Sequence, residues 1–409
     1  MTLRPPFRLS ARARRIEPFY VMEMAKHAAA LAARDAEGKE SGPPMIRLNI
    51  GEPDFTAPPL VQQAAERAIR DGRTQYTHAC GLPELRERIS AWYAERFGVA
   101  VPASRIVVTA GASAALQLAC LALLDEGDEV LMPDPCYPCN RQFVASAGGR
   151  AVLLPATAQA RFQLDAAQVQ AAWGPRTRGV LLASPSNPTG TSIAPQELAR
   201  IHAAAQAREG FTLVDEIYLG LSFDTAYGQS ALRLSPDIIS INSFSKYFCM
   251  TGWRLGWMVV PPRMAQLVEQ LAQHLFICPS AVAQHAALAC FEPESLAEYE
   301  RRRAEFRARR DWFVPQLAAL GLRVPVMPDG AFYAWADCAE AARRLGGSSD
   351  GADMDSWDFA FALMERARLA VTPGRDFGHN GTAHCVRFSV ANALPQLQEA
   401  VARMQALLP

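Results

Sequence analysis

Lys246 is the residue whose surroundings point most directly to chemistry. It ends the run Asn242-Ser243-Phe244-Ser245-Lys246, which follows a short apolar segment. A lysine in a dehydrated pocket loses its proton well below the usual pKa of about 10.4, and the neutral amine is a nucleophile towards aldehydes. Ser243 and Ser245 offer hydroxyl donors for an anion, and the rigid fork of Arg254 suits a phosphate. This stretch therefore predicts a reactive amine beside an anion site.

A carboxylate follows another apolar run. Asp215 comes directly after Thr212–Val214. Burying an unpaired carboxylate is costly, so Asp215 needs a partner. That partner is a salt bridge or a helix cap in the structural interpretation, and a cationic ring nitrogen in the functional one.

Two further strand ends carry polar or small residues. Asn187 follows the run Gly179–Ala183, in a turn that two prolines and a glycine hold. After Ile106–Thr109, small residues that include Ala112 and Ser113 open directly into a helix. Backbone N–H groups and the helix dipole favour an anion at such a place. Each of these motifs alone is better explained by ordinary turn structure.

Together these groups predict one site. In parallel α/β sheets, ligands bind beyond the carboxyl ends of the strands, where these residues lie. A ligand that needs an amine, phosphate donors and a carboxylate for a ring nitrogen is pyridoxal 5′-phosphate (PLP). The carboxylate keeps the pyridine nitrogen protonated, so that the ring is an electron sink.

The segment Ser243–Gly256, which includes Met250-Thr251-Gly252-Trp253-Arg254-Leu255-Gly256, resembles the lysine signature of class I, fold-type I PLP-dependent aminotransferases. One position departs, since Cys249 stands where the family usually has Ala, Gly or Ser. The resemblance covers nearly the whole chain, from Gly51-Glu52-Pro53-Asp54-Phe55 to Val386-Arg387-Phe388-Ser389. Within this family, the chain is similar to the aspartate, aromatic and alanine aminotransferases.

The resemblance implies a role for each site residue. Lys246 would be the Schiff-base lysine and proton shuttle, with Asp215 and Tyr218 as further catalytic residues. The implied cofactor-binding residues are Ala112, Ser113, Tyr137, Asn187, Asp215, Tyr218, Ser243, Ser245, Lys246, Arg254 and, from the neighbouring subunit, Tyr76. The implied substrate-binding residues are Gly51, Asn187 and Arg387, which would grip the α-carboxylate. A homodimer with shared active sites is expected.

The expected function is PLP-dependent transfer of an amino group from an L-amino acid to a 2-oxo acid, by a ping-pong mechanism, within amino-acid metabolism and biosynthesis. A C–S β-lyase or a synthase on the same scaffold is the alternative, and pyruvate and ammonia formed without an acceptor would reveal the lyase. A PLP-binding regulator would carry a helix-turn-helix unit, which the residues before Gly51 do not show. A nucleotide-binding enzyme would carry a phosphate-binding glycine motif, and the sequence shows no convincing motif of this kind. The resemblance leans to a broad or aspartate-like donor, but the sequence does not identify it.

The elements that must position these residues alternate along the chain. Apolar runs such as Glu129–Met132 and Asp237–Ile241 alternate with helical segments such as Leu82–Phe97, which predicts βαβ units and a mainly parallel central sheet flanked by helices. A helix is also expected over 17–34 and a short strand over Ile46–Ile50. After a charged helix over 295–319, the texture becomes α+β, with strands expected over Phe332–Ala336 and His384–Val390, and a smaller domain is expected. The predicted division is 1–55 for an N-terminal arm and part of the small domain, 56–300 for the PLP-binding domain and 301–409 for the small domain.

The composition excludes other classes. The 41 basic and 41 acidic residues cancel, so no field attracts nucleic acid or anionic lipid. The longest apolar run, Leu116–Leu124, is too short to cross a membrane. Nine scattered cysteines indicate reduced thiols and a cytoplasmic location, and Cys136 and Cys139 are interpreted as free thiols in a turn rather than a redox or metal pair. No metal site is expected from the histidine spacing.

Overall fold

The computed structural model describes residues 7–16, 20–36, 42–346 and 354–408. Its main feature is a seven-stranded sheet with the strand order β2-β8-β7-β6-β5-β3-β4. Every neighbouring pair is parallel except those made by β8, which is antiparallel to both β2 and β7. Its strands are β2 (Ile106–Thr109), β3 (Glu129–Asp134), β4 (Arg150–Pro155), β5 (Thr177–Ala183), β6 (Phe211–Asp215), β7 (Ile239–Ser243) and β8 (Gly256–Val259). The predicted α/β fold with a mainly parallel sheet is confirmed.

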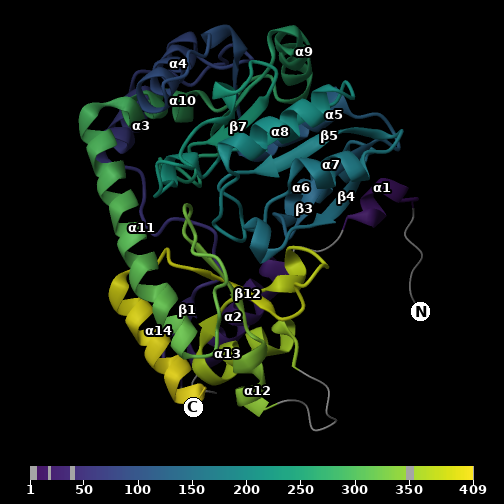
Figure 1. Cartoon of the computed structure of the whole chain (residues 1–409). Helices are drawn as coiled ribbons and strands as arrows, with labels where there is room; N and C mark the ends of the chain where they lie inside the picture. Colours follow the sequence, from purple (N-terminus) through teal and green to yellow (C-terminus); the bar gives the residue numbers. More distant parts are fainter. Residues whose placement is uncertain (1–6, 17–19, 37–41, 347–353, 409) are drawn as a thin grey trace.

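Helices cover this sheet (Figure 1). Several of them begin with proline, which fits the first helical turn because its missing N–H has no partner there anyway. Examples are Pro83 and Pro195, and the first of these helices ends at Gly98, whose φ of 64° suits a helix end. The helices in this part of the chain are α3 (Pro59–Arg70), α4 (Pro83–Phe97), α5 (Gly111–Leu123), α6 (Pro138–Ser146), α7 (Ala166–Ala172), α8 (Pro195–Gln206), α9 (Ala265–Leu275) and α10 (Ala281–Leu288).

The two faces of the sheet bury separate cores. Side chains alternate along each strand, so Leu181 and Leu213 join the core under α5 and α9, whereas Leu182 and Val214 join the core under α7 and α8. Both faces are therefore apolar, as expected for parallel strands covered on two sides. Polar groups are left to the strand ends.

The C-terminal part of the chain has its own small sheets. β9 (Tyr333–Asp337), β12 (Cys385–Ser389) and β11 (Thr372–Pro373) form an antiparallel sheet, and β1 (Ile46–Arg47) pairs in parallel with β10 (Leu369–Ala370). The helices packed here are α2 (Tyr20–Ala36), α12 (Ala339–Gly346), α13 (Ser356–Ala367) and α14 (Leu394–Leu407). Segments from both ends of the chain thus share one region, at the lower part of Figure 1.

The long helix α11 (Pro293–Ala319) joins the two parts of the molecule. In Figure 1 it runs along one side, from the level of α3 and α10 to that of α14. The helix continues through residue 300, where the sequence placed a domain boundary. The division at residues 55 and 300 stays a prediction. The short helix α1 (Ala11–Arg15) contacts α6, whereas Arg4 of the basic N-terminal arm and the predicted start of a helix at residue 17 lie outside the described residues.

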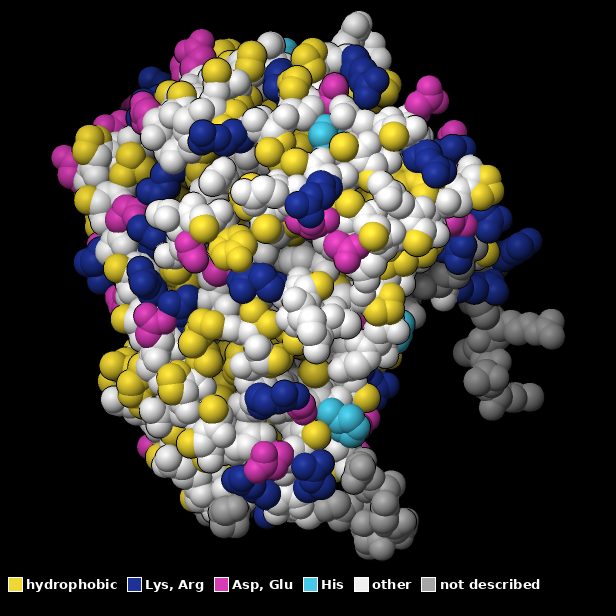
Figure 2. Space-filling model, in the orientation of Figure 1, with side chains coloured by type: hydrophobic (Ala, Val, Ile, Leu, Met, Phe, Trp, Pro, Cys, Tyr) yellow, Lys and Arg dark blue, Asp and Glu magenta, His cyan; other side chains and the backbone are white. Residues whose placement is uncertain are grey.

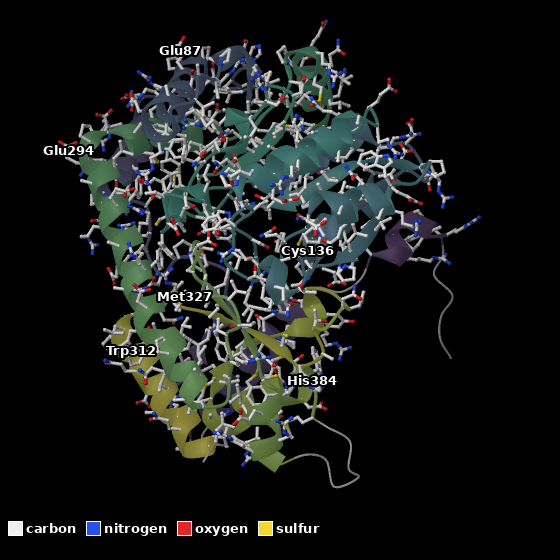
Figure 3. The ribbon with its side chains drawn as sticks, in the orientation of Figure 1. Glu87, Cys136, Glu294, Trp312, Met327 and His384 are labelled. Atoms are coloured by element: carbon white, nitrogen blue, oxygen red, sulfur yellow. The ribbon has the colours of Figure 1, made fainter. Side chains whose placement is uncertain are left out.

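Figure 2 shows basic and acidic side chains interspersed over one face of the molecule, in line with their equal numbers. Among the described residues, no helix combines the length and the apolar character that a membrane span requires. The nine cysteines, all within the described ranges, are free thiols, including Cys136 and Cys139. The turn expected around both residues is the start of a helix, because Cys136 precedes α6 and Cys139 lies in its first turn. Figure 3 places Cys136 near the junction between the large sheet and the C-terminal part.

Candidate active site

A cavity of about 410 Å³ lies beyond the carboxyl ends of the parallel strands. It is lined by every predicted site residue except Tyr76, namely Gly51, Ala112, Ser113, Tyr137, Asn187, Asp215, Tyr218, Ser243, Ser245, Lys246, Arg254 and Arg387. These residues come from the ends of several strands and from the small sheet, and the fold brings them together.

The Lys246 amine lies within the cavity. Its Nζ donates a hydrogen bond to the carbonyl oxygen of Gly51 at 2.6 Å and lies 5.8 Å from the centroid of the Tyr218 ring. Burial lowers the pKa of this lysine to about 8, since the charged form loses its hydration. Near neutral pH an appreciable share of the amine is neutral and able to react with a carbonyl group.

Asp215 is a buried carboxylate that lines the cavity. It ends β6, is 4% exposed, and its Oδ1 accepts one hydrogen bond from the backbone N–H of Ile217 at 3.1 Å. Burial raises the pKa of its carboxyl group to about 7. A buried carboxylate with so little compensation is suited to a cationic partner, which would hold it ionised.

An anion site lies between β7 and the start of α5. Ser243 Oγ donates to Ser245 Oγ at 2.9 Å, and the Arg254 guanidinium lies against Gly111. A Cβ at Gly111 would come within 2.6 Å of Arg254 Nη2, and its φ of +81° also favours glycine. Ala112 and Ser113 follow in the first turn of the helix, where backbone N–H groups are unpaired. This cradle of backbone donors, hydroxyl groups and one guanidinium suits a phosphate.

Arg387 faces the cavity from β12 and is 3% exposed. It donates from Nη1 to Asn187 Oδ1 at 2.7 Å and from Nη2 to the Asn49 carbonyl oxygen at 2.6 Å. Its Nε has no hydrogen-bond partner among the described residues. The guanidinium is thus held from behind with donor capacity to spare, as the binding of a carboxylate requires.

Three tyrosines, Tyr137, Tyr218 and Tyr333, also line the cavity. Tyr218 Oη lies 2.7 Å from Tyr333 Oη, and burial raises the pKa of the Tyr218 phenol well above 10. Burial also raises the pKa of Tyr137. Both phenols of the predicted site therefore stay protonated and can donate hydrogen bonds at physiological pH.

Tyr76 is the predicted site residue that the fold leaves apart. It is 84% exposed and does not line the cavity of its own chain. The exposed ring is therefore accessible to another molecule.

Tyr333 is a functional candidate that sequence reasoning missed. Its ring lies 4.3 Å from the Arg387 guanidinium, and a Cβ at Gly51 would come within 2.6 Å of its Oη. Tyr333 pairs with Ser389 across the small sheet, two residues from Arg387. A signal existed, because strands were expected over Phe332–Ala336 and His384–Val390, but their register could not be read from the sequence.

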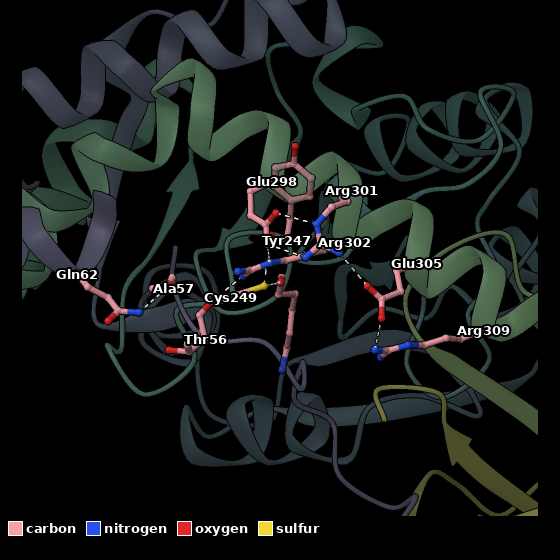
Figure 4. Close-up of polar contacts among 11 residues, drawn as sticks. Thr56, Ala57, Gln62, Tyr247, Cys249, Glu298, Arg301, Arg302, Glu305 and Arg309 are labelled. Atoms are coloured by element: carbon pink, nitrogen blue, oxygen red, sulfur yellow. Dashed lines mark hydrogen bonds and ion pairs between the residues drawn. The ribbon is translucent and has the colours of Figure 1, made fainter. Parts of the chain in front are cut away.

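The segment that carries Gly51 is clamped from behind by α11. Arg302 donates from Nη1 to the Thr56 carbonyl oxygen at 2.6 Å, and Arg309 Nη1 lies 2.8 Å from Asp54 Oδ1. Both guanidinium groups lie over the Phe55 ring, at 5.0 and 5.2 Å from its centroid. Figure 4 shows Arg302 reaching towards Thr56 and Arg309 bound to Glu305 of the same helix. The clamp fixes the backbone whose carbonyl group holds Lys246.

One group of described side chains has the chemistry of metal ligands. Ligand atoms of His78, Cys80 and Glu269 lie within 4.8 Å of one another. Nδ1 of His78 accepts the N–H of Cys80 at 3.1 Å and its Nε2 lies 3.4 Å from Glu269 Oε1. Both ring nitrogens are already engaged by protein groups, so this arrangement carries no metal assignment.

Comparison with known proteins agrees with this geometry. Residues 43–404 match the model of the family "Aminotransferase class I and II". The chain is 37% identical over 395 residues to the valine–pyruvate aminotransferase of Mycobacterium tuberculosis, covering 96% of this chain and 97% of that one. Among solved structures, it resembles an aminotransferase from Mycobacterium tuberculosis, with a TM-score of 0.90, 36% identity and 98% and 99% of the two chains covered.

A further similar structure is the aspartate aminotransferase of Thermus thermophilus with maleate. The TM-score is 0.88 and the identity 31%, with 98% of this chain and 100% of that chain covered. This chain covers 97–100% of these relatives, and two of their names give different substrates, valine–pyruvate and aspartate. The chain therefore belongs to the class I and II aminotransferase family and is a transaminase.

Proposed function

We propose that this transaminase binds PLP covalently through Lys246 and transfers the amino group of an L-amino acid to a 2-oxo acid at the described cavity. The observation that carries the proposal is that the Lys246 amine shares one cavity with a buried carboxylate and an anion cradle. Burial lowers the pKa of this amine to about 8. When bound, PLP supplies a protonated ring that takes up the electron pair released at the substrate α-carbon.

The residues present fit this cofactor. Asp215 is a buried carboxylate suited to a ring N–H⁺, and the cradle of Ser243, Ser245 and Arg254 at Gly111 suits the phosphate. The phenol of Tyr218 and the amide of Asn187 would hold the ring hydroxyl oxygen, and Tyr137 would stack on the ring face. Ala112 and Ser113 would add phosphate donors. The donor set thus covers each polar group of the cofactor.

The protein residues have separate tasks in the reaction. Arg387, with the backbone of Gly51, would hold the substrate α-carboxylate, and its free Nε leaves a donor for that purpose. Fixing the carboxylate orients the Cα–H bond towards Lys246, a positioning effect. Once the substrate amine has displaced it from the cofactor, the neutral amine of Lys246 would take the α-proton and deliver it to the cofactor carbon. Two half-reactions in alternation give ping-pong kinetics.

Borohydride trapping tests the proposal. The sequence has three lysines, Lys26, Lys39 and Lys246. Reduction of the purified holoenzyme with borohydride, followed by proteolysis and mass spectrometry, is expected to add the cofactor mass to the Lys246 peptide. The Lys26 and Lys39 peptides serve as internal controls. A label on either of these, or on no peptide, would remove the assignment of Lys246.

A homodimer is proposed as the working unit. The exposure of Tyr76 supports this proposal, since its side chain is available to reach the phosphate of a second subunit. Light scattering is expected to give twice the chain mass of 44.6 kDa. A monomeric mass for an active preparation would exclude shared sites. The cytoplasmic location and a role in biosynthesis stay predictions.

A further inference from the structure

The cavity is lined by both polar and apolar side chains. Its charged lining includes Lys246, Asp215 and Arg254. Its apolar lining includes Ile50 and residues of the N-terminal helix α2 whose side chains have no polar groups. These α2 residues are Val21, Met22 and Ala25. An apolar wall beside a site for an α-carboxylate is where a substrate side chain would lie.

The charges around this wall oppose a second carboxylate. The described cations that line the cavity are Lys246, Arg254 and Arg387, and each already has a task in the proposed function. Glu52 also lines the cavity and accepts a hydrogen bond from Thr251, so it adds a negative charge. No described cation of this chain is left to pair with a side-chain carboxylate at this wall, and desolvating an unpaired carboxylate is costly.

Helix α2 is held firmly where it meets the cavity. The Asp376 carboxylate accepts the N–H groups of Tyr20 and Val21 at 3.2 and 3.1 Å, and a carboxylate at a helix N-terminus is favourable. Met24 and Ala28, on the neighbouring face of the helix, are buried in the main core. The orientation of α2 is therefore fixed, and Val21 and Ala25 form a built wall of the cavity.

Building on the proposed function, we propose that the donor substrates of this enzyme are amino acids with uncharged, apolar side chains, which pack against Val21, Met22 and Ala25 of α2. The α-carboxylate binds Arg387 and the amino group faces Lys246. The side chain then leaves water for the α2 wall, which stabilises apolar substrates in proportion to the area buried. This differs from the aspartate-like donor towards which the family resemblance leans.

A comparison of donors in the first half-reaction tests the proposal without any acceptor. The rate at which the cofactor absorbance changes gives kcat/KM for L-valine, L-leucine, L-aspartate and L-glutamate. Valine and leucine are expected to exceed the acidic donors by at least about tenfold, the discrimination that buried methylene groups give. Calorimetry with isovalerate and maleate, which do not react, is expected to show tighter binding of isovalerate. Faster reaction of aspartate or glutamate, or tighter binding of maleate, overturns the proposal.

A matched pair of variants tests the role of α2. Ala25→Arg places a cation in the wall, whereas Ala29→Arg places it one turn later, at an exposed position outside the cavity. Ala25→Arg is expected to lower kcat/KM for valine by at least about tenfold and to raise the aspartate-to-valine ratio, with no change in Ala29→Arg. Equal behaviour of two folded variants contradicts the α2 assignment. If Ala25→Arg does not fold, the donor and analogue comparisons decide.

The outcome also separates this proposal from the proposed function. If no amino acid reacts and borohydride labels no lysine, the proposed function itself fails, and the side-chain assignment with it. If Lys246 is labelled and acidic donors react best, the cofactor assignment stands and the apolar substrate class is wrong.

Discussion

Replacing Lys246 by alanine is expected to lower kcat/KM for amino transfer by at least about 10³-fold, because a positioned acid–base group contributes about 10²–10⁴ and the covalent anchor is lost as well. The amine lies 2.6 Å from the Gly51 carbonyl oxygen, inside the cavity, and among the residues that line it no other amine can move the α-proton. Steady-state assays over a range of donor and acceptor concentrations measure the effect.

Two control variants make this result specific. Lys246→Arg keeps a cation but removes a nucleophilic amine, and it is expected to be as inactive as the alanine variant. Lys26→Ala removes an exposed lysine that pairs with Glu23 on α2, and its activity is expected to stay at the wild-type level. Wild-type turnover by either Lys246 variant would show that another group carries the chemistry.

The variant Asp215→Asn is expected to lower kcat by about 10²–10³, the loss that removal of one preorganised electrostatic partner typically causes. The amide has nearly the shape of the carboxylate but carries no charge, so it cannot keep a ring nitrogen protonated. Asp215 is buried and bound by one backbone N–H, so its charge is available to a ligand. Single-turnover assays at saturating donor isolate this effect from substrate binding.

The neighbouring residue gives a matched control. Glu216 is equally buried, and burial raises its carboxyl pKa to about 7, but it accepts hydrogen bonds from Ser230, Ser240 and the N–H of Ala231. Glu216→Gln is expected to reduce the free energy of unfolding by about 1–3 kcal/mol, because it disturbs buried hydrogen bonds, and to leave kcat nearly unchanged. If both variants lose stability and activity alike, Asp215 has a structural role and the electron-sink argument fails.

Much of the cavity could be predicted because its residues follow short apolar runs. In a parallel sheet such runs are buried on both faces, so polar residues at their ends gather at one edge. Asp215 and Asn187 were found in this way, and the fold brings both to the cavity. The chemistry of the site is thus largely local in the sequence.

Strand boundaries were less well predicted because pairing extends beyond apolar runs. The expected strand Asp237–Ile241 is Ile239–Ser243 in the structure, since Asn242 and Ser243 continue the ladder with β8. Conversely, the expected strand Ile46–Ile50 ends at Arg47, because the Asn49 carbonyl oxygen binds Arg387 instead of a strand. Main-chain partners of this kind lie far away in the sequence and leave no local pattern.

The apolar wall could not be predicted for the same reason. A helix was expected near residues 17–34, but its apolar pattern does not say against which surface it packs. Its place depends on Asp376, whose carboxylate binds α2 across more than 350 residues of chain. Tyr333 was missed because its position beside Arg387 depends on how β9 and β12 pair, and the sequence does not reveal this register.

The hydrogen bonds from α2 to Asp376 fix the apolar wall of the cavity independently of the large sheet. The proposed reactive groups Lys246 and Asp215 follow strands of the large sheet, whereas one wall of the cavity comes from α2. Substitutions in α2 are therefore expected to change which substrate side chains fit the cavity while Lys246 and Asp215 keep their positions. Exchange of this helix together with the segment around Asp376 would alter substrate choice on an unchanged sheet.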